Sequence, residues 1–230
     1  MVTQRGGKNR RAAPKSRWAA HLPDELKPAR EDLVSGAALD GVYATGNLGG
    51  EPGGDIVENA ELTNMRWNGG QLIGRRFRRL HCRNVVFENC DLSGVIIEES
   101  SLSRVEFQEC RMSGMVFGGS KIEDVLFSSC KLDLANLRMT KGKRLEFLAC
   151  DLREADFYGG DFADTRIYDS NLSSANYTQA SMDGLRLHGS VLWDLKGASA
   201  LEGVVISQDQ LMDMSVALFA DSAISIDDER

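Results

Sequence analysis

The chain has 230 residues, of which 42% are hydrophobic and 27% are charged, with a formal net charge of −7. No stretch approaches the roughly 18 apolar residues of a membrane helix, and no apolar segment follows the basic N-terminus as a signal peptide requires. We therefore expect a cytoplasmic protein without a membrane segment, built as one elongated domain with terminal extensions rather than as two globular domains.

Charge is distributed unevenly along the chain. Residues 1–30 carry eight Lys or Arg and two acids, whereas residues 31–60 carry six acids and no base. Residues 201–230 carry seven acids and one base, and the region between them, 61–200, is nearly neutral with 19 acids and 18 bases. The basic first thirty residues contain three prolines and little apolar periodicity, which predicts a disordered arm. Such a basic arm can bind nucleic acid, an acidic partner protein or the acidic ends of its own chain.

Residues 31–59 carry an irregular form of a pattern that becomes strict further on, in which an apolar residue recurs every five positions. Leu39, Val42 and Ile56 belong to it, and the stretch GNLGGEPGG interrupts it. Glycine-rich stretches are typical of loops. We expect an irregular first coil of a repeat structure, carrying a loop.

From residue 60 to residue 206 the five-residue pattern is nearly continuous. Between Leu62 and Leu192, almost every position whose number ends in 2 or 7 holds a bulky apolar residue, and the position two residues earlier is usually small or medium. Gly142 is the exception in the central repeats. A five-residue spacing matches neither the roughly 3.6-residue period of a helix nor the two-residue alternation of a strand. The chain must therefore turn a corner in each repeat and point two side chains inward.

Residue identities that recur every twenty positions give the circumference of one coil. Two such series are Cys90, Cys110, Cys130 and Cys150, and Phe87, Phe107, Phe127 and Phe147. Twenty residues are four repeats, so each coil has four sides. Several charges twenty residues apart are opposite, as at Glu123 and Lys143, which supports this register because such residues would stack on one another.

Segments such as ENCDLSG, SSCKLDLANL and ACDLREADF resemble the pentapeptide repeat family over residues 60–207. The resemblance implies an all-β fold, a right-handed quadrilateral β-helix, usually of bacterial origin. The C-terminal pattern LEGVVISQDQLMDMSVALFA is similar to uncharacterised actinobacterial members. Some members imitate duplex DNA by shape and negative charge and act on DNA gyrase, with effects on quinolone susceptibility. The nearly neutral coils depart from that pattern, and only 146–169, with seven acids and two arginines, fits it.

Residues 207–230 change to a helical pattern that ends in an acidic tail. Ser207 and Gln210 have the spacing of a capping box. Apolar residues then follow at the spacing of one wide helix face: Leu211, Met212, Met214, Val216, Leu218 and Phe219. The open end of a β-helix exposes unpaired backbone, so we expect a capping helix, with a dimerisation helix as the alternative.

The sequence contains no recognisable catalytic, cofactor or metal motif. The three histidines are scattered, and the cysteines fall at inward positions, where cysteine is usually a small buried apolar residue. One thiol per coil also lacks the converging ligands of a zinc site. We therefore predict a protein that is not an enzyme and that uses no cofactor or metal.

Two groups of residues are candidate contacts. Outward apolar positions predict a protein contact surface at Leu126, Leu148, Tyr158, Tyr168 and His188. The arginine-rich segment RRFRRLHCR suggests an anion contact at Arg75, Arg76 and Arg83, although Arg75 falls at an inward position.

These observations predict a non-enzymatic binding scaffold whose rigid faces contact another macromolecule, most simply a protein of unknown identity. The alternative is a DNA mimic that acts on gyrase. A homodimer through the C-terminal helix is compatible with either function, and nucleic acid is expected to bind only through the basic arm.

Overall fold

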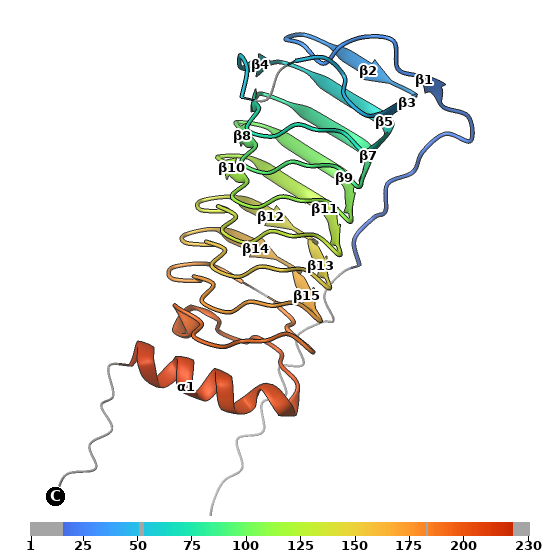
Figure 1. The fold of residues 1–230 in the computed structure, drawn as a ribbon. Helices are drawn as coiled ribbons and strands as arrows, with labels where there is room; N and C mark the ends of the chain where they lie inside the picture. The colour runs from blue at the N-terminus through green and yellow to red at the C-terminus, as the bar shows by residue number, and fades with distance from the viewer. Residues whose placement is uncertain (1–15, 51–52, 183, 223–230) are drawn as a thin grey trace, which may run out of the picture.

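The computed structural model describes residues 16–50, 53–182 and 184–222. The chain forms a rod of stacked coils, with a helix lying across the C-terminal end (Figure 1). In chain order the elements are β1 (Lys27–Pro28), β2 (Ala38–Asp40), β3 (Val42–Thr45), β4 (Val57–Glu58), β5 (Glu61–Asn68), β6 (Arg76–Arg78), β7 (His81–Glu88), β8 (Ile96–Glu98), β9 (Ser101–Gln108), β10 (Val116–Gly118), β11 (Lys121–Ser128), β12 (Lys141–Lys143), β13 (Glu146–Leu148), β14 (Asp161–Ala163), β15 (Arg166–Tyr168), the 3-10 turns η1 (Ala198–Ala200) and η2 (Gln208–Gln210), and α1 (Leu211–Asp221).

Strands of successive coils pair in parallel with an offset of twenty residues, so that Phe107 lies between Phe87 and Phe127. One sheet runs along the rod from β1 through β3, β5, β7, β9 and β11 to β12 and β14, and β13 and β15 extend it beside β11. A second sheet contains β4, β6, β8 and β10, and single bridges such as Asp91 to Arg111 join the coils on a further side. The prediction of a β-solenoid with a C-terminal helix is confirmed.

A left-handed backbone conformation makes the corners of the coil. Asn84, Arg104 and Asp124 occupy the same position in β7, β9 and β11, with φ angles of 53°, 54° and 58°. Asn, Asp and Gly accept this conformation at low cost, which explains why they are frequent at outward positions of the repeat. Each of these three strands therefore bends in its middle and covers two sides of the coil.

The core is a column of side chains along the axis of the rod. The rings of Phe87, Phe107, Phe127 and Phe147 stack with centroid separations of 5.0, 5.1 and 4.7 Å. Beside them, Cys110 donates a hydrogen bond from Sγ to the carbonyl of Phe87 at 3.5 Å, and Cys130 donates to that of Phe107 at 3.3 Å. The cysteines are thus buried members of the core.

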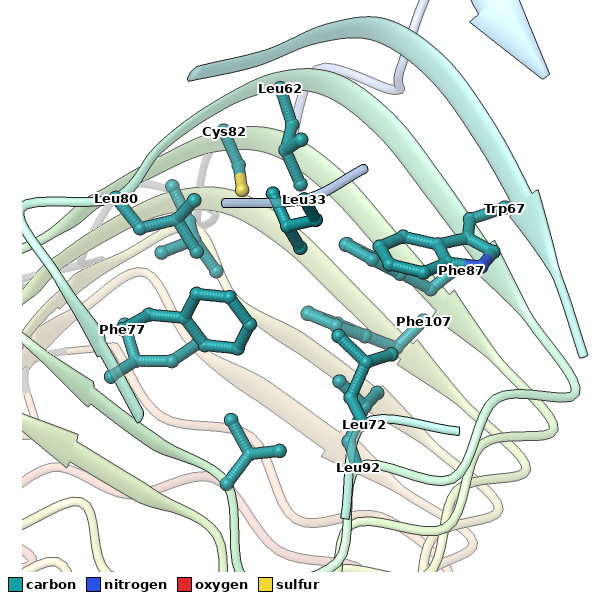
Figure 2. A pocket seen from close by; sticks show the side chains of 13 residues that line it. Leu33, Leu62, Trp67, Leu72, Phe77, Leu80, Cys82, Phe87, Leu92 and Phe107 are labelled. Atoms are coloured by element: carbon teal, nitrogen blue, oxygen red, sulfur yellow. The ribbon is translucent and has the colours of Figure 1, made fainter. Parts of the chain in front are cut away.

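The first coil departs from the regular repeat. Ala38 pairs with Glu61, an offset of 23 residues, because the glycine-rich loop lengthens this coil. Leu33 reaches into the N-terminal end of the core beside Leu62 and Cys82, and the rings of Trp67, Phe87 and Phe107 follow one another beneath it (Figure 2).

At the C-terminal end, α1 covers the last coil (Figure 1). Met214 and Ala217 are buried, whereas Leu211, Met212, Val216, Leu218 and Phe219 remain exposed. The predicted wide apolar face therefore packs against the rod only along the narrow line of Met214 and Ala217. The helix begins at Leu211 after the turn η2. Residues 223–230, which include most of the expected acidic tail, lie outside the described residues.

Candidate functional site

Three of the predicted contact residues form a row on the outer surface of the rod. Leu148 in β13 pairs in register with Tyr168 in β15. The ring of Tyr168 meets that of His188 on the next coil edge to face, with centroids 5.9 Å apart. All three side chains are partly exposed. We call Leu148, Tyr168 and His188 the contact row.

The other two predicted contact residues do not belong to this row. Leu126 lies on the same side, in β11, but only 8% of it is exposed, so it cannot offer a free surface. Tyr158 lies on another side of the coil, where the guanidinium of Arg138 stacks over its ring at 4.2 Å from the centroid. The structure therefore brings together three of the five residues and separates the other two.

The N-terminal arm binds to the acids on either side of Leu126, Glu106 and Glu146. Residues 16–26 run along the outside of the rod, beside the ends of β11 and β9, toward β1 (Figure 1). Arg17 donates from Nη1 to Glu106 Oε1 at 3.0 Å and from Nε to Glu146 Oε2 at 2.9 Å. These contacts hold the part of the arm that the structure describes, from residue 16 onward, against the rod. Residues 1–15 of the predicted disordered arm (1–30) lie outside the described residues.

Two backbone N–H groups of the arm also donate to carboxylates of the rod. Trp18 N–H donates to Asp124 Oδ1 at 2.9 Å, and Ala20 N–H donates to Glu106 Oε1 at 3.2 Å. Burial alone would raise the pKa of Asp124, but hydrogen bonds from Arg144 and from the Trp18 backbone outweigh it and hold that pKa below its ordinary value. We call Glu106, Asp124 and Glu146 the acidic strip.

Nothing in the sequence pattern pointed to the acidic strip, because its three members occupy outward positions like many other acids in the chain. The available signal was the excess of basic residues in 1–30. That excess indicated an acidic binding surface without indicating where on the rod it lies.

The three arginines of the predicted anion contact do not converge. Only 5% of Arg75 is exposed, and its guanidinium donates to the carbonyls of Leu33 at 2.7 Å and Gly49 at 3.2 Å. It therefore ties the irregular first coil to the regular ones. Arg76 lies in β6 and Arg83 in β7, which belong to different sheets, so the predicted three-arginine patch is not formed.

The described residues contain no group of His, Cys, Asp and Glu with the geometry of a metal site. The cavity at the N-terminal end of the core is lined only by apolar side chains and Cys82 (Figure 2), and burial raises the pKa of that thiol to about 12. Within the described part of the chain, no helix is long and apolar enough to cross a membrane.

The family model for the pentapeptide repeat region matches residues 60–137 and 100–177, together just over half of the 230-residue chain. The chain belongs to the pentapeptide repeat family. No curated protein matches this pentapeptide repeat protein.

Solved structures of other pentapeptide repeat proteins are similar to the chain. Full-length QnrB1, described as a plasmid-mediated fluoroquinolone resistance protein, is 19% identical with a TM-score of 0.47, over 79% of this chain and 97% of QnrB1. HetL, described as involved in heterocyst differentiation regulation in the cyanobacterium Nostoc, is 16% identical with a TM-score of 0.34, over 77% of this chain and 92% of HetL.

Proposed function

We propose that this pentapeptide repeat protein is a non-enzymatic binding scaffold that contacts another protein through the contact row. The observation that carries the proposal is the stacking of Leu148, Tyr168 and His188 at the surface of successive coils. Apolar and aromatic side chains that a fold leaves partly exposed in one continuous row are typical of a contact surface.

The rod supports such a contact in two ways. Its coils are held in register by backbone hydrogen bonds, so the spacing of the row is already set and little conformational freedom is lost when a partner binds. Tyr168 also combines a broad apolar ring with a hydroxyl group, and residues of this kind dominate the binding energy of protein interfaces.

A pull-down from a bacterial lysate tests the proposal, since we predict a cytoplasmic protein. The bait is the wild-type protein, and the test variant is Leu148→Glu with Tyr168→Glu. Leu134→Glu with Met139→Glu is the matched control, because these residues are 57% and 65% exposed at corners away from the row. A partner captured by the wild type and the control, and lost with the test variant, supports the proposal. A captured set that is identical for all three proteins contradicts it.

The second candidate is a DNA mimic that acts on gyrase. It is favoured by the presence of Glu88, Glu106 and Glu146 on one side of three nearby coils, in β7, β9 and β13. The acid-rich stretch 146–169 does not itself make an acidic face, because a coil of twenty residues distributes its side chains over all four sides. A supercoiling assay with purified gyrase tests this candidate: inhibition that is lost with Glu106→Lys and Glu146→Lys would support it, and unchanged supercoiling would reject it.

A homodimer through α1 is compatible with both candidates. Met212, Val216 and Phe219 are 73%, 60% and 53% exposed, and such a group of apolar side chains on one short helix suits a second copy of the same helix. The molar mass by light scattering should double at high concentration and should return to that of the monomer in Met212→Glu with Phe219→Glu. A monomer at every concentration would exclude this contact.

A further inference from the structure

The described part of the arm is held on the rod as a bound peptide would be, and not as a further strand. Between residues 16 and 26 it contains no strand, and the rod atoms that it contacts through hydrogen bonds are carboxylate oxygens of the acidic strip. Backbone pairing with the rod begins only at Lys27, whose N–H donates to the carbonyl of Gly41. The segment from 16 to 26 is therefore attached to carboxylate side chains of the rod, and the same carboxylates can bind a segment of another protein.

The rod holds the acidic strip in position through its own residues. Arg166 donates to Glu146 Oε1 at 2.8 Å, which leaves Oε2 for the arm. Gln108 donates to Glu106 Oε2 at 3.0 Å, which leaves Oε1 for the arm.

Asp124 is fixed in the same way by Arg144, which donates to both of its carboxylate oxygens at 2.6 and 2.8 Å. All three carboxylates thus have their orientation set by a neighbour on the rod. A site whose groups are already oriented loses less conformational freedom when a ligand binds.

Apolar residues alternate with the acids of the strip. Glu106 pairs in register with Val86 on one side and with Leu126 on the other, and Leu126 pairs with Glu146. Val86 and Leu126 are only 5% and 8% exposed although they point outward from the rod. The surface beneath the arm therefore offers both charge and apolar area to an extended chain.

The features of the arm that the strip recognises are few. They are one guanidinium, from Arg17, and the backbone N–H groups of Trp18 and Ala20. The side chain of Trp18 is 66% exposed, so its indole is not what the strip selects. Any extended segment with a suitably placed arginine presents the same chemistry.

From these contacts we propose that the acidic strip is a binding site for an extended, arginine-bearing segment of a partner protein. The chain's own arm occupies this site, and a partner must displace the arm in order to bind. The inference goes beyond the proposed function, because it assigns a second surface and the chemistry of its ligand.

Occupation by the arm has a measurable consequence. A tethered segment is present at a high effective concentration near its site, so it lowers the apparent affinity of a free competitor. The contacts are largely ionic, so salt weakens both the tethered and the free segment. Weakening the arm should therefore make the site more available, whereas weakening the strip should abolish binding.

A fluorescently labelled peptide with the sequence of residues 12–24 is the probe, and anisotropy is the readout. We expect the full chain carrying Arg17→Ala to bind it about tenfold more tightly than the wild type, because its own arm has lost both ion pairs. Adding Glu106→Gln and Glu146→Gln should weaken binding about tenfold or more. Adding Glu109→Gln instead, at an exposed acid of the corner that follows β9, should change the affinity little.

If the variant with Glu106→Gln and Glu146→Gln melts at a lower temperature, its weaker binding could reflect lost stability. A second probe, tested on every protein, separates the two explanations. The same peptide with alanine in place of its arginine should bind none of the proteins. Equal binding of both peptides, or equal affinity of the wild type and Arg17→Ala for the first, would overturn the inference. Leu134→Glu with Met139→Glu, at exposed corners away from the strip, should leave peptide binding unchanged.

Discussion

The ring of Phe162 fills the space that a side chain at position 142 would need. A Cβ atom built on Gly142 would overlap Cδ1 of Phe162 and would lie 2.8 Å from Cδ1 of Leu145. The missing apolar residue in the five-residue pattern is therefore compensated by the next coil, and no bulge or ligand site is needed to explain it.

Gly142→Ala should lower the free energy of unfolding by about 1–3 kcal/mol, the usual cost of overpacking a core. Chemical denaturation measures it. Gly118→Ala is the matched control, since its Cβ would meet only Glu98 Cγ at 3.4 Å, and it should be nearly neutral. Phe162→Leu combined with Gly142→Ala should recover part of the loss. Equal stability of Gly142→Ala and the wild type would contradict the packing argument.

The thiols should be inert in the folded protein. All five cysteines are buried, so the folded rod keeps a reagent from their sulfur atoms. Burial also raises the pKa of Cys82 to about 12, so the reactive thiolate form of this residue is scarce at neutral pH. A thiol reagent such as Ellman's should modify none of the five in the native state and all of them in denaturant. Rapid reaction of one thiol in the native state would show that its part of the rod opens. Cys130→Ser should fold, because Ser120 makes the equivalent hydrogen bond, to the carbonyl of Ile97.

The sequence was sufficient to predict the coil, because one side-chain pattern repeats many times and each repeat supports the others. The repeat also predicted which positions point inward, at the stacked phenylalanines and the cysteines, and which point outward, at the three residues of the contact row. Ion pairs between coils were predicted less well. Glu123 pairs with Lys143, and Glu146 with Arg166, at the expected offset of twenty residues. Arg78 instead pairs with Glu99 and Glu58 and not with Glu98, the acid at that offset, because a long side chain can reach several acids.

The acidic strip could not be predicted, since it depends on one arginine meeting two acids that lie 89 and 129 residues away. No local pattern records such a contact. The burial of Arg75 was only partly predictable: its inward position was visible, but its carbonyl acceptors belong to the irregular first coil, whose backbone follows no repeat.

The contribution of Asp124 to stability should disappear in acid. Its pKa is lower in the folded protein than in the unfolded chain, so its contribution is complete above the unfolded value of about 3.9 and is lost as the pH falls through the folded value. Asp124→Asn should lower the free energy of unfolding by about 1–3 kcal/mol at neutral pH.

The measurement for Asp124 is denaturation of both proteins from neutral pH down to about pH 3, in the range below its unfolded pKa. The difference between wild type and Asp124→Asn should be constant near neutral pH and should shrink below about pH 4. The exposed Asp161 gives the control variant, Asp161→Asn, which should be nearly neutral throughout. A difference for Asp124→Asn that does not change with pH would show that its charge is not involved.

Gln210 should be the most sensitive residue of the C-terminal end. It is 3% exposed, its Nε2 donates to the carbonyls of Leu187 and Ser190, and its Oε1 accepts the backbone N–H of Ser207 at 2.9 Å. Gln210→Ala leaves both carbonyls without this partner, and a buried unsatisfied polar group costs about 1–3 kcal/mol. Hydrogen exchange over residues 185–206 should therefore accelerate, whereas the exposed Gln208→Ala should leave it unchanged.

Gln210→Glu separates the hydrogen bonds from the shape of the side chain. At neutral pH its carboxylate would face the carbonyl oxygens of Leu187 and Ser190, so the loss of stability should exceed that of Gln210→Ala. Burial next to acceptors raises a carboxyl pKa, so the penalty should be present above the folded pKa and should fade as the pH drops and the acid becomes a donor. If Gln210→Glu and Gln210→Ala were equally stable at every pH, the two carbonyls would not depend on this side chain. The cap would then be held by its other contacts, the buried Met214 and Ala217 and the hydrogen bonds from Gly197 and Ser199 to Asp221.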